Sequence, residues 1–185
     1  MFELGCFVED CRAAVAGADG PRTVRELVAE ALSEPATVAT ALGESSQAGI
    51  RTLHRAPDLT VLDFTWAPWM SLKPHDHHMW AVIGILFGRE DNIFWKRTGQ
   101  GIEAVGARAL GVGDAAPLGR DIIHSVLNPI GKFTRALHVY AGDFFAPPQP
   151  RSEWDPETLG ERAWDMEDTR RGFAEAEARF RATGR

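Results

Sequence analysis

The stretch Pro74-His75-Asp76-His77-His78-Met79-Trp80-Ala81-Val82 begins with closely spaced histidines and passes directly into a segment that is apolar throughout 80–86. A run that is apolar at every position is typical of a β-strand covered on both faces. Because side chains two apart on a strand point to the same face, we expect His75 and His77 to point together. The stretch therefore predicts a buried strand preceded by two convergent imidazoles.

Further apolar segments with turn residues between them extend this pattern from about residue 50 to about residue 145. Glycines and Asn128-Pro129 mark several of the turns. Short strands at such close spacing predict an all-β antiparallel barrel or sandwich. The expected strands cover 59–66, 80–86, 92–97, 102–108, 122–127 and 133–140.

Helical patterns flank this β region on both sides. In the N-terminal segment 1–45, the expected helices cover 3–16, 24–32 and 34–42. The C-terminal extension 146–185 starts with a proline-rich crossing, and a charged helix is expected over 156–181. A chain of 185 residues is most simply one domain, 1–185, with the β-barrel at 50–145.

The composition narrows the possible partners. A formal net charge of −6 gives no reason to expect nucleic acid. No apolar run approaches the roughly 20 residues that span a bilayer, and no basic segment followed by an apolar block opens the chain. Cys6 and Cys11 lie on an expected helix and do not suggest a disulfide scaffold. We therefore expect a cytoplasmic protein that associates with neither nucleic acid nor membrane.

A second polar motif lies downstream, where Gly113-Asp114-Ala115-Ala116-Pro117-Leu118-Gly119 precedes His124 and Asn128 follows it. His124 sits in an apolar, β-branched segment and is the candidate for a third imidazole beside His75 and His77. Three neutral imidazoles with open positions suit a redox-active or Lewis-acidic divalent metal better than a closed structural site. Two other interpretations stay open, namely surface histidines on a turn at the first motif and a buried structural histidine at the second.

The two motifs together resemble the cupin superfamily, whose metal ligands lie on a double-stranded β-helix, a small jelly-roll barrel. The usual glutamate after the second histidine is absent here, and Glu90 comes too late to replace it. The three-histidine pattern that remains resembles the thiol dioxygenases, such as cysteine dioxygenase and the bacterial 3-mercaptopropionate dioxygenase-like proteins. The resemblance covers roughly residues 50–155 and implies a cupin barrel with flanking helices.

This resemblance implies a mononuclear non-haem site in which His75, His77 and His124 bind Fe(II), or another divalent metal. Such enzymes add both atoms of O₂ to a small thiol carboxylate and form a sulfinate. The segment Leu137–Asp143 resembles the family's Ser-x-His-x-Tyr segment and implies a relay of His138 and Tyr140.

The match is incomplete at two places. Ala136 stands where the family has its serine, so the relay histidine needs a different neighbour. The segment Arg151–Asp155 resembles the one that supplies a carboxylate-binding arginine, which implies that Arg151 binds the substrate. Four other arginines compete for this role, namely Arg51, Arg55, Arg97 and Arg120.

Two rival functions remain. One is another three-histidine cupin enzyme, which would be a dioxygenase for a diketone or hydroxyketone, a lyase or an isomerase. The other is a non-catalytic cupin that binds a small molecule. In the preferred interpretation, the partners are a small-molecule substrate and O₂, and the protein is a monomer or a homodimer.

Overall fold

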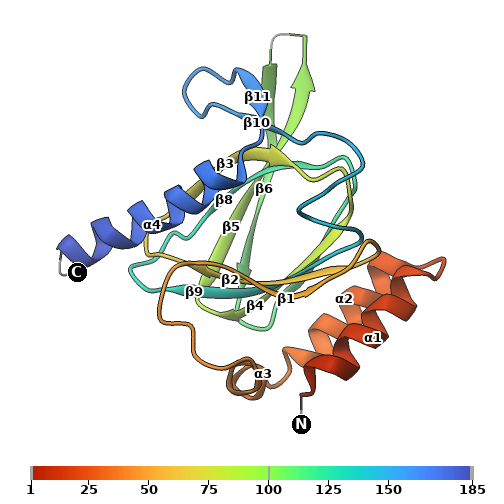
Figure 1. Ribbon diagram of the computed structural model, residues 1–185. Coiled ribbons are helices and arrows are strands. Elements are labelled where there is room, and N and C mark those ends of the chain that lie inside the picture. Colours follow the sequence, from red (N-terminus) through yellow and green to blue (C-terminus); the bar gives the residue numbers. More distant parts are fainter. Residues whose placement is uncertain (1, 100, 184–185) are drawn as a thin grey trace.

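Two antiparallel sheets face each other in the computed structural model, which describes residues 2–99 and 101–183 (Figure 1). The first sheet has the strand order β1-β2-β9-β4-β7, and the second has the order β11-β10-β3-β8-β5-β6. The strands are β1 (Gly49–Arg55), β2 (Thr60–Trp66), β3 (Ser71–Asp76), β4 (Ala81–Phe87), β5 (Arg89–Thr98), β6 (Gly101–Gly111), β7 (Ala115–Leu118), β8 (Ile123–Leu127), β9 (Thr134–Tyr140), β10 (Ser152–Trp154) and β11 (Glu161–Ala163).

The pairing of strands β2 to β9 is nested. β5 pairs with β6, β4 with β7, β3 with β8 and β2 with β9, all antiparallel. This is the pattern of one long hairpin rolled up into two facing sheets, which defines a jelly roll. The expected all-β double-stranded β-helix with flanking helices is therefore confirmed, and the strand order alone establishes it.

Strand β4 is buried on both faces, as its continuous apolar sequence predicts. Ala81, Ile83 and Ile85 belong to the core inside the barrel. Val82 and Leu86 belong to a second apolar cluster, which the N-terminal helices form with the outer face of the sheet. The first sheet therefore has one face toward the barrel interior and one face toward a helical layer.

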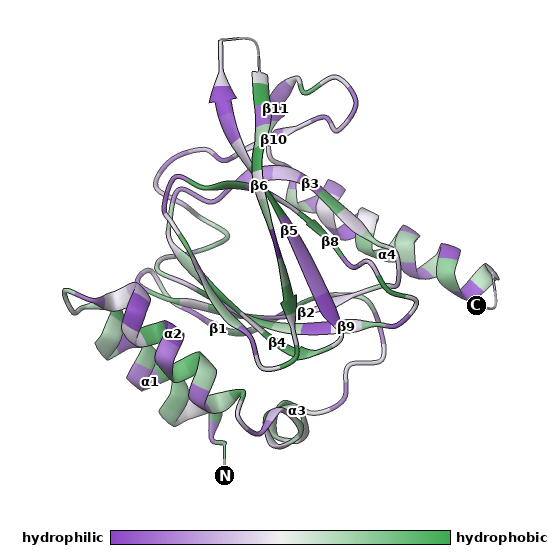
Figure 2. Ribbon diagram, turned by 180° about the vertical axis from the view of Figure 1, so that it is seen from behind, coloured by the Kyte–Doolittle hydropathy of each residue, from purple (hydrophilic) through white to green (hydrophobic). Residues whose placement is uncertain are grey.

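This helical layer consists of α1 (Leu4–Val15), α2 (Gly20–Ala31) and α3 (Pro35–Leu42), with α1 and α2 below the first sheet in Figure 1. Helix α2 begins earlier than expected, because Pro21 occupies its first turn, where a missing amide donor is tolerated. Figure 2 shows hydrophilic and hydrophobic residues mixed along these helices. Among the helices that the structure describes, none is both long and apolar enough to cross a membrane.

The expectation of a helix over 156–181 is wrong in its first part. Residues 152–163 form the hairpin β10–β11, and the helix α4 begins only at Met166 and runs to Thr183. The Asp155 carboxylate accepts hydrogen bonds from the backbone amides of Glu157 and Thr158 and so closes the turn. Because this turn chemistry outweighs the helix propensity of the charged residues, the segment adds strands to the second sheet.

Candidate metal centre

The register of β3 and β8 brings two of the three predicted histidines together. His75 on β3 lies directly opposite His124 on β8, and His77 follows the end of β3. All three side chains are buried, and one potential ligand atom from each lies within 4.8 Å of the others. The structure thus gathers the imidazoles that the sequence motifs singled out, although His77 lies just beyond the strand rather than on it.

Hydrogen bonds on the outer side of this cluster orient two of the rings. His75 Nδ1 donates to the Lys73 carbonyl at 2.8 Å, and His124 Nδ1 donates to the Asn92 side-chain oxygen at 2.6 Å. Both partners are oxygen acceptors, so each Nδ1 carries the proton and each Nε2 keeps its lone pair. This outer contact is the one that metal-ligating histidines usually make.

His77 is left with an unsatisfied ring nitrogen. Its Nε2 lies 3.3 Å from Nε2 of His124. Within the described residues, no hydrogen-bond partner reaches its buried Nδ1. Two nitrogens that share a divalent ion at about 2.0–2.1 Å are separated by about 3.0–3.4 Å, so the spacing and the donor set fit such an ion.

Burial also keeps these imidazoles neutral. It lowers the pKa of His75 to about 3, with a further contribution from the positive charge of Arg151. The pKa values of His77 and His124 are lowered well below their ordinary value, again mainly by burial and then by the neighbouring histidines. Only a neutral imidazole can bind a metal, and the cluster is therefore competent as a ligand set near neutral pH.

Arg151 contributes a buried positive charge near the histidines. Its side chain is stacked on two aromatic rings, with the guanidinium carbon 4.4 Å from the centroid of Phe144 and 3.6 Å from that of Trp164. Its Nε donates to the Asp76 carbonyl at 2.8 Å. In the part of the chain that the structure describes, Nη1 and Nη2 have no hydrogen-bond partner, and burial lowers the Arg151 pKa to about 10.

The four competing arginines are placed differently. Arg51 pairs with Asp63, Arg55 with Asp143, and Arg97 with Glu161 and Asp76. Arg120 is exposed. Of these candidates, Arg151 is the arginine with a buried and unpaired guanidinium beside the cluster.

Tyr140 and His138 lie on β9 and point into the same interior. The Tyr140 hydroxyl and His138 Nδ1 are 3.0 Å apart, and the Tyr140 ring meets the His77 ring edge to face at 5.2 Å. Burial raises the pKa of Tyr140, so that its hydroxyl stays protonated. The expected pair is thus formed, and it adjoins the three histidines.

Sequence reasoning missed two polar residues of this interior, Glu90 and Asn92 on β5. Both are buried, and Asn92 is the residue that holds His124. The available signal was their spacing, since Glu90, Asn92 and Phe94 follow a period of two and so share one face of a strand. Glu90 lies too far along the chain from His77 to fit the usual metal-ligand position, and its place in the sequence says nothing about a partner on another strand.

The cavity beside the cluster is small. It is lined by His75, His124, His138 and Tyr140 together with aromatic side chains that include Phe144 and Trp164, and its volume is about 10 Å³. These side chains therefore nearly fill the space beside the cluster.

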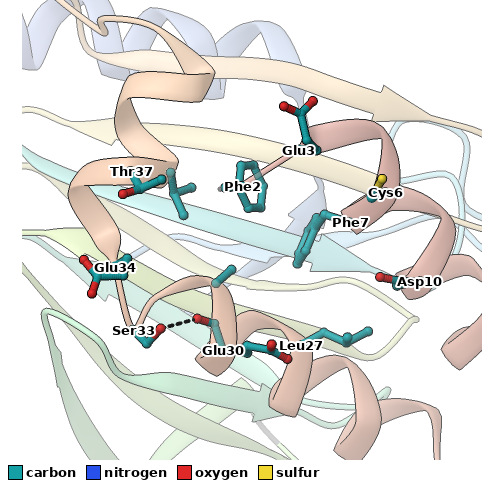
Figure 3. A pocket seen from close by; sticks show the side chains of 12 residues that line it. Phe2, Glu3, Cys6, Phe7, Asp10, Leu27, Glu30, Ser33, Glu34 and Thr37 are labelled. Atoms are coloured by element: carbon teal, nitrogen blue, oxygen red, sulfur yellow. Dashed lines mark hydrogen bonds between the residues drawn. The ribbon is translucent and has the colours of Figure 1, made fainter.

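A larger groove of about 540 Å³ lies elsewhere, on the helical layer. Figure 3 shows the rings of Phe2 and Phe7 in this groove, with Glu34 and Asp10 near its rim. No imidazole lines it, so its size does not make it the reactive site.

No protein-family model matches the chain, and the comparison with curated proteins finds no match. Similar solved structures include an uncharacterised conserved protein with a double-stranded β-helix domain from Klebsiella pneumoniae (13% identity, 66% of this chain, 89% of that chain, TM-score 0.44). A second is an RmlC-like cupin family protein from Methanocaldococcus jannaschii (8% identity, 55% of this chain, 86% of that chain, TM-score 0.46). A third is a Bacillus subtilis oxalate decarboxylase mutant (15% identity, 56% of this chain, 28% of that chain, TM-score 0.45). At these identities and TM-scores, no activity transfers to this chain.

Proposed function

We propose that this double-stranded β-helix protein is a mononuclear non-haem Fe(II) dioxygenase that oxidises a small thiol carboxylate to a sulfinate. His75, His77 and His124 are the proposed metal ligands. The observation that carries the proposal is the buried, unpaired guanidinium of Arg151 next to three neutral imidazoles. The nearest described carboxylates, Asp76 and Glu153, form ion pairs with other cations, so an anionic substrate would supply the partner that the Arg151 terminal nitrogens lack.

The overall reaction converts R–SH and O₂ into R–SO₂H, so both oxygen atoms enter the product and no further reductant is needed. When bound, ferrous iron supplies the Lewis acidity that favours a thiolate and the electron exchange that lets O₂ react. The protein residues bind and orient the substrate at this ion, which makes the encounter nearly intramolecular.

Arg151 is the proposed carboxylate-binding residue. Its Nη1 and Nη2 can donate two parallel hydrogen bonds to one carboxylate. Phe144 and Trp164 both contact the guanidinium, and they also line the cavity with His75 and His124. A substrate carboxylate at Arg151 would thus leave the thiol end of a short molecule near the histidines.

The same contact argues against a diketone, the substrate of the main rival function. A diketone can bind a metal ion as an enolate, but its single negative charge would then lie at the ion, and the Arg151 guanidinium would stay without an anionic partner. A non-catalytic binding protein would use Arg151 in the same way, and only turnover distinguishes it from an enzyme.

The test is O₂ consumption by protein loaded anaerobically with Fe(II). We expect uptake with 3-mercaptopropionate or cysteine, formation of the corresponding sulfinate, and much less uptake with cysteamine or a diketone. Arg151→Gln should raise KM for the carboxylated thiol by about 10–100-fold, since it removes charge-assisted hydrogen bonds. Arg120→Gln, at an exposed position, is the matched control and should leave KM unchanged. Iron-loaded protein that consumes no O₂ with any thiol would refute the proposal.

A further inference from the structure

A carboxylate and an imidazole face each other in the interior, between the two sheets. Glu90 on β5 is fully buried, and its Oε2 lies 3.4 Å from Nε2 of His138 on β9. Neither atom has a hydrogen-bond partner elsewhere in the described chain. A buried carboxylate needs donors, and the His138 ring nitrogen is the donor placed for it.

The other carboxylate oxygen of Glu90 leads back to the metal centre. Asn92 Nδ2 donates to Glu90 Oε1 at 3.0 Å, and the side-chain oxygen of Asn92 accepts the hydrogen bond from His124 Nδ1 at 2.6 Å. On the far side, His138 Nδ1 lies 3.0 Å from the hydroxyl of Tyr140. The five side chains therefore form a continuous polar chain from a candidate ligand to the tyrosine.

We propose that Glu90 is the positioning residue of the Tyr140–His138 pair and determines which nitrogen of His138 carries the proton. The inference rests on the proposed function only for the use of the pair in catalysis. A carboxylate only accepts hydrogen bonds, so His138 Nε2 carries the proton and donates it toward Glu90. The Nδ1 lone pair then accepts from the Tyr140 hydroxyl.

This arrangement of donors and acceptors determines the direction in which a proton can pass, from Tyr140 to His138. With its proton toward His138, Tyr140 presents oxygen lone pairs to the cavity and can accept the proton of a substrate thiol. The S–H bond breaks as a new O–H bond forms on Tyr140, and the original tyrosine proton passes to His138 Nδ1. The products are a thiolate and an imidazolium, and the Glu90 carboxylate stabilises the imidazolium. Glu90 thus supplies, from a distant strand, the neighbour that Ala136 cannot provide on β9.

Glu90→Gln tests which nitrogen of His138 carries the proton. The amide has the same shape as the carboxylate, but an NH₂ donor replaces one of the two acceptor oxygens. Asn92 still donates to the remaining oxygen, so the new amide NH₂ faces His138 Nε2. That nitrogen must then accept, and the proton moves to Nδ1. The opposite amide orientation would turn Asn92 over and present its NH₂ to His124 Nδ1, which would cost metal affinity.

The measurement is the NMR nitrogen chemical shift of His138 in isotope-labelled, zinc-loaded full-length protein, with the metal affinity determined in parallel. We expect a protonated Nε2 in the wild type. In Glu90→Gln we expect an unprotonated Nε2 or, with the amide reversed, metal affinity about 10–100-fold lower. Identical His138 protonation and identical metal affinity in the two proteins would overturn the inference.

Two further variants separate positioning from general stability. Glu90→Asp restores a carboxylate and should return the proton to Nε2. Asp63→Asn removes another buried carboxylate, one that pairs with Arg51 and Arg135; it should lower stability without changing His138.

Turnover gives an independent reading. If the iron-loaded enzyme oxidises thiols, Glu90→Gln should lower kcat by about 10–100-fold with little change in KM, as for loss of a partner that orients a reacting group. If no thiol is oxidised but the His138 proton still moves, the proposed function fails and the role of Glu90 stands.

Discussion

The two sheets of the barrel contribute differently to the site. The second sheet and the turn after β3 provide the three histidines, and β5 of the same sheet provides Asn92 and Glu90. The first sheet provides His138 and Tyr140 from β9, a strand buried along its whole length. The first sheet is also covered outside by the N-terminal helices, whereas β6 at the edge of the second is largely exposed.

The candidate metal ligands and the Tyr140–His138 pair thus come from different sheets, and Glu90 and Asn92 connect them across the interior. The ligand set depends on the register of β3 against β8, which places His75 opposite His124. The Tyr140–His138 pair lies on β9, which is packed between β2 and β4. Substitution of a histidine in the second sheet should therefore affect metal affinity. Substitutions between the first sheet and its helical layer should affect stability.

The largest expected effect follows removal of a ligand from the second sheet. His124→Ala leaves only two imidazoles at the cluster and frees Asn92 from its hydrogen bond. We expect the affinity for divalent metal to fall by more than about 100-fold, which exceeds the usual effect of losing an outer partner. Metal content and calorimetric titration of the folded protein measure it.

His54→Ala is the control for this substitution, because His54 lies on β1 of the first sheet. It should bind metal as the wild type does. Equal loss of affinity in both variants would contradict the assignment of the ion to the second sheet.

The next effect tests the layer behind the first sheet. A Cβ at Gly84 on β4 would lie 2.4 Å from a methyl carbon of Val28 and 2.7 Å from one of Leu32, at the contact with α2. Gly84→Ala should therefore lower the free energy of unfolding by about 1–3 kcal/mol through overpacking. Denaturant unfolding gives the change, and metal affinity of the folded variant should be unaltered. A variant with wild-type stability would show that α2 can move away from the sheet.

The barrel could be predicted because its signals are local. A strand that is apolar at every position, such as β4, is typical of a strand buried on both faces, so its own sequence predicts this burial. The two histidine motifs likewise carry their spacing within a few residues. Their convergence needed the resemblance to a known family, since strand order brings together segments that are distant in the chain.

The remaining features depend on contacts that no local pattern encodes. Glu90 meets His138 because β5 and β9 face each other across the barrel, and a lone acid in a sequence does not reveal such a partner. The hairpin β10–β11 was missed because glutamates and arginines favour a helix, while a single aspartate at the turn determined the outcome. The unpaired state of Arg151 follows from the aromatic rings that enclose it, which come from separate segments.

The smallest effect concerns the contact of α4 with the second sheet. Lys73 on β3 donates to the Asp168 carboxylate of α4 at 2.8 Å, and this contact lowers the pKa of Asp168. A carboxyl whose pKa is lowered by folding contributes stability above its unfolded value, about 3.9, and that contribution is lost as the pH falls through the folded value.

Asp168→Asn should accordingly cost at most about 1 kcal/mol near neutral pH, because the pair is partly exposed. The cost should shrink at acid pH, as the pH falls through the lowered pKa of Asp168 and the wild-type carboxyl becomes protonated too. Denaturant unfolding of both proteins at the two pH values gives the difference, and Glu26→Gln, at an exposed position of α2, serves as the control. A cost that persisted in acid would mean that α4 is held by the shape of the Asp168 side chain and its packing, and that its charge has no part in joining the helix to the sheet that carries the histidines.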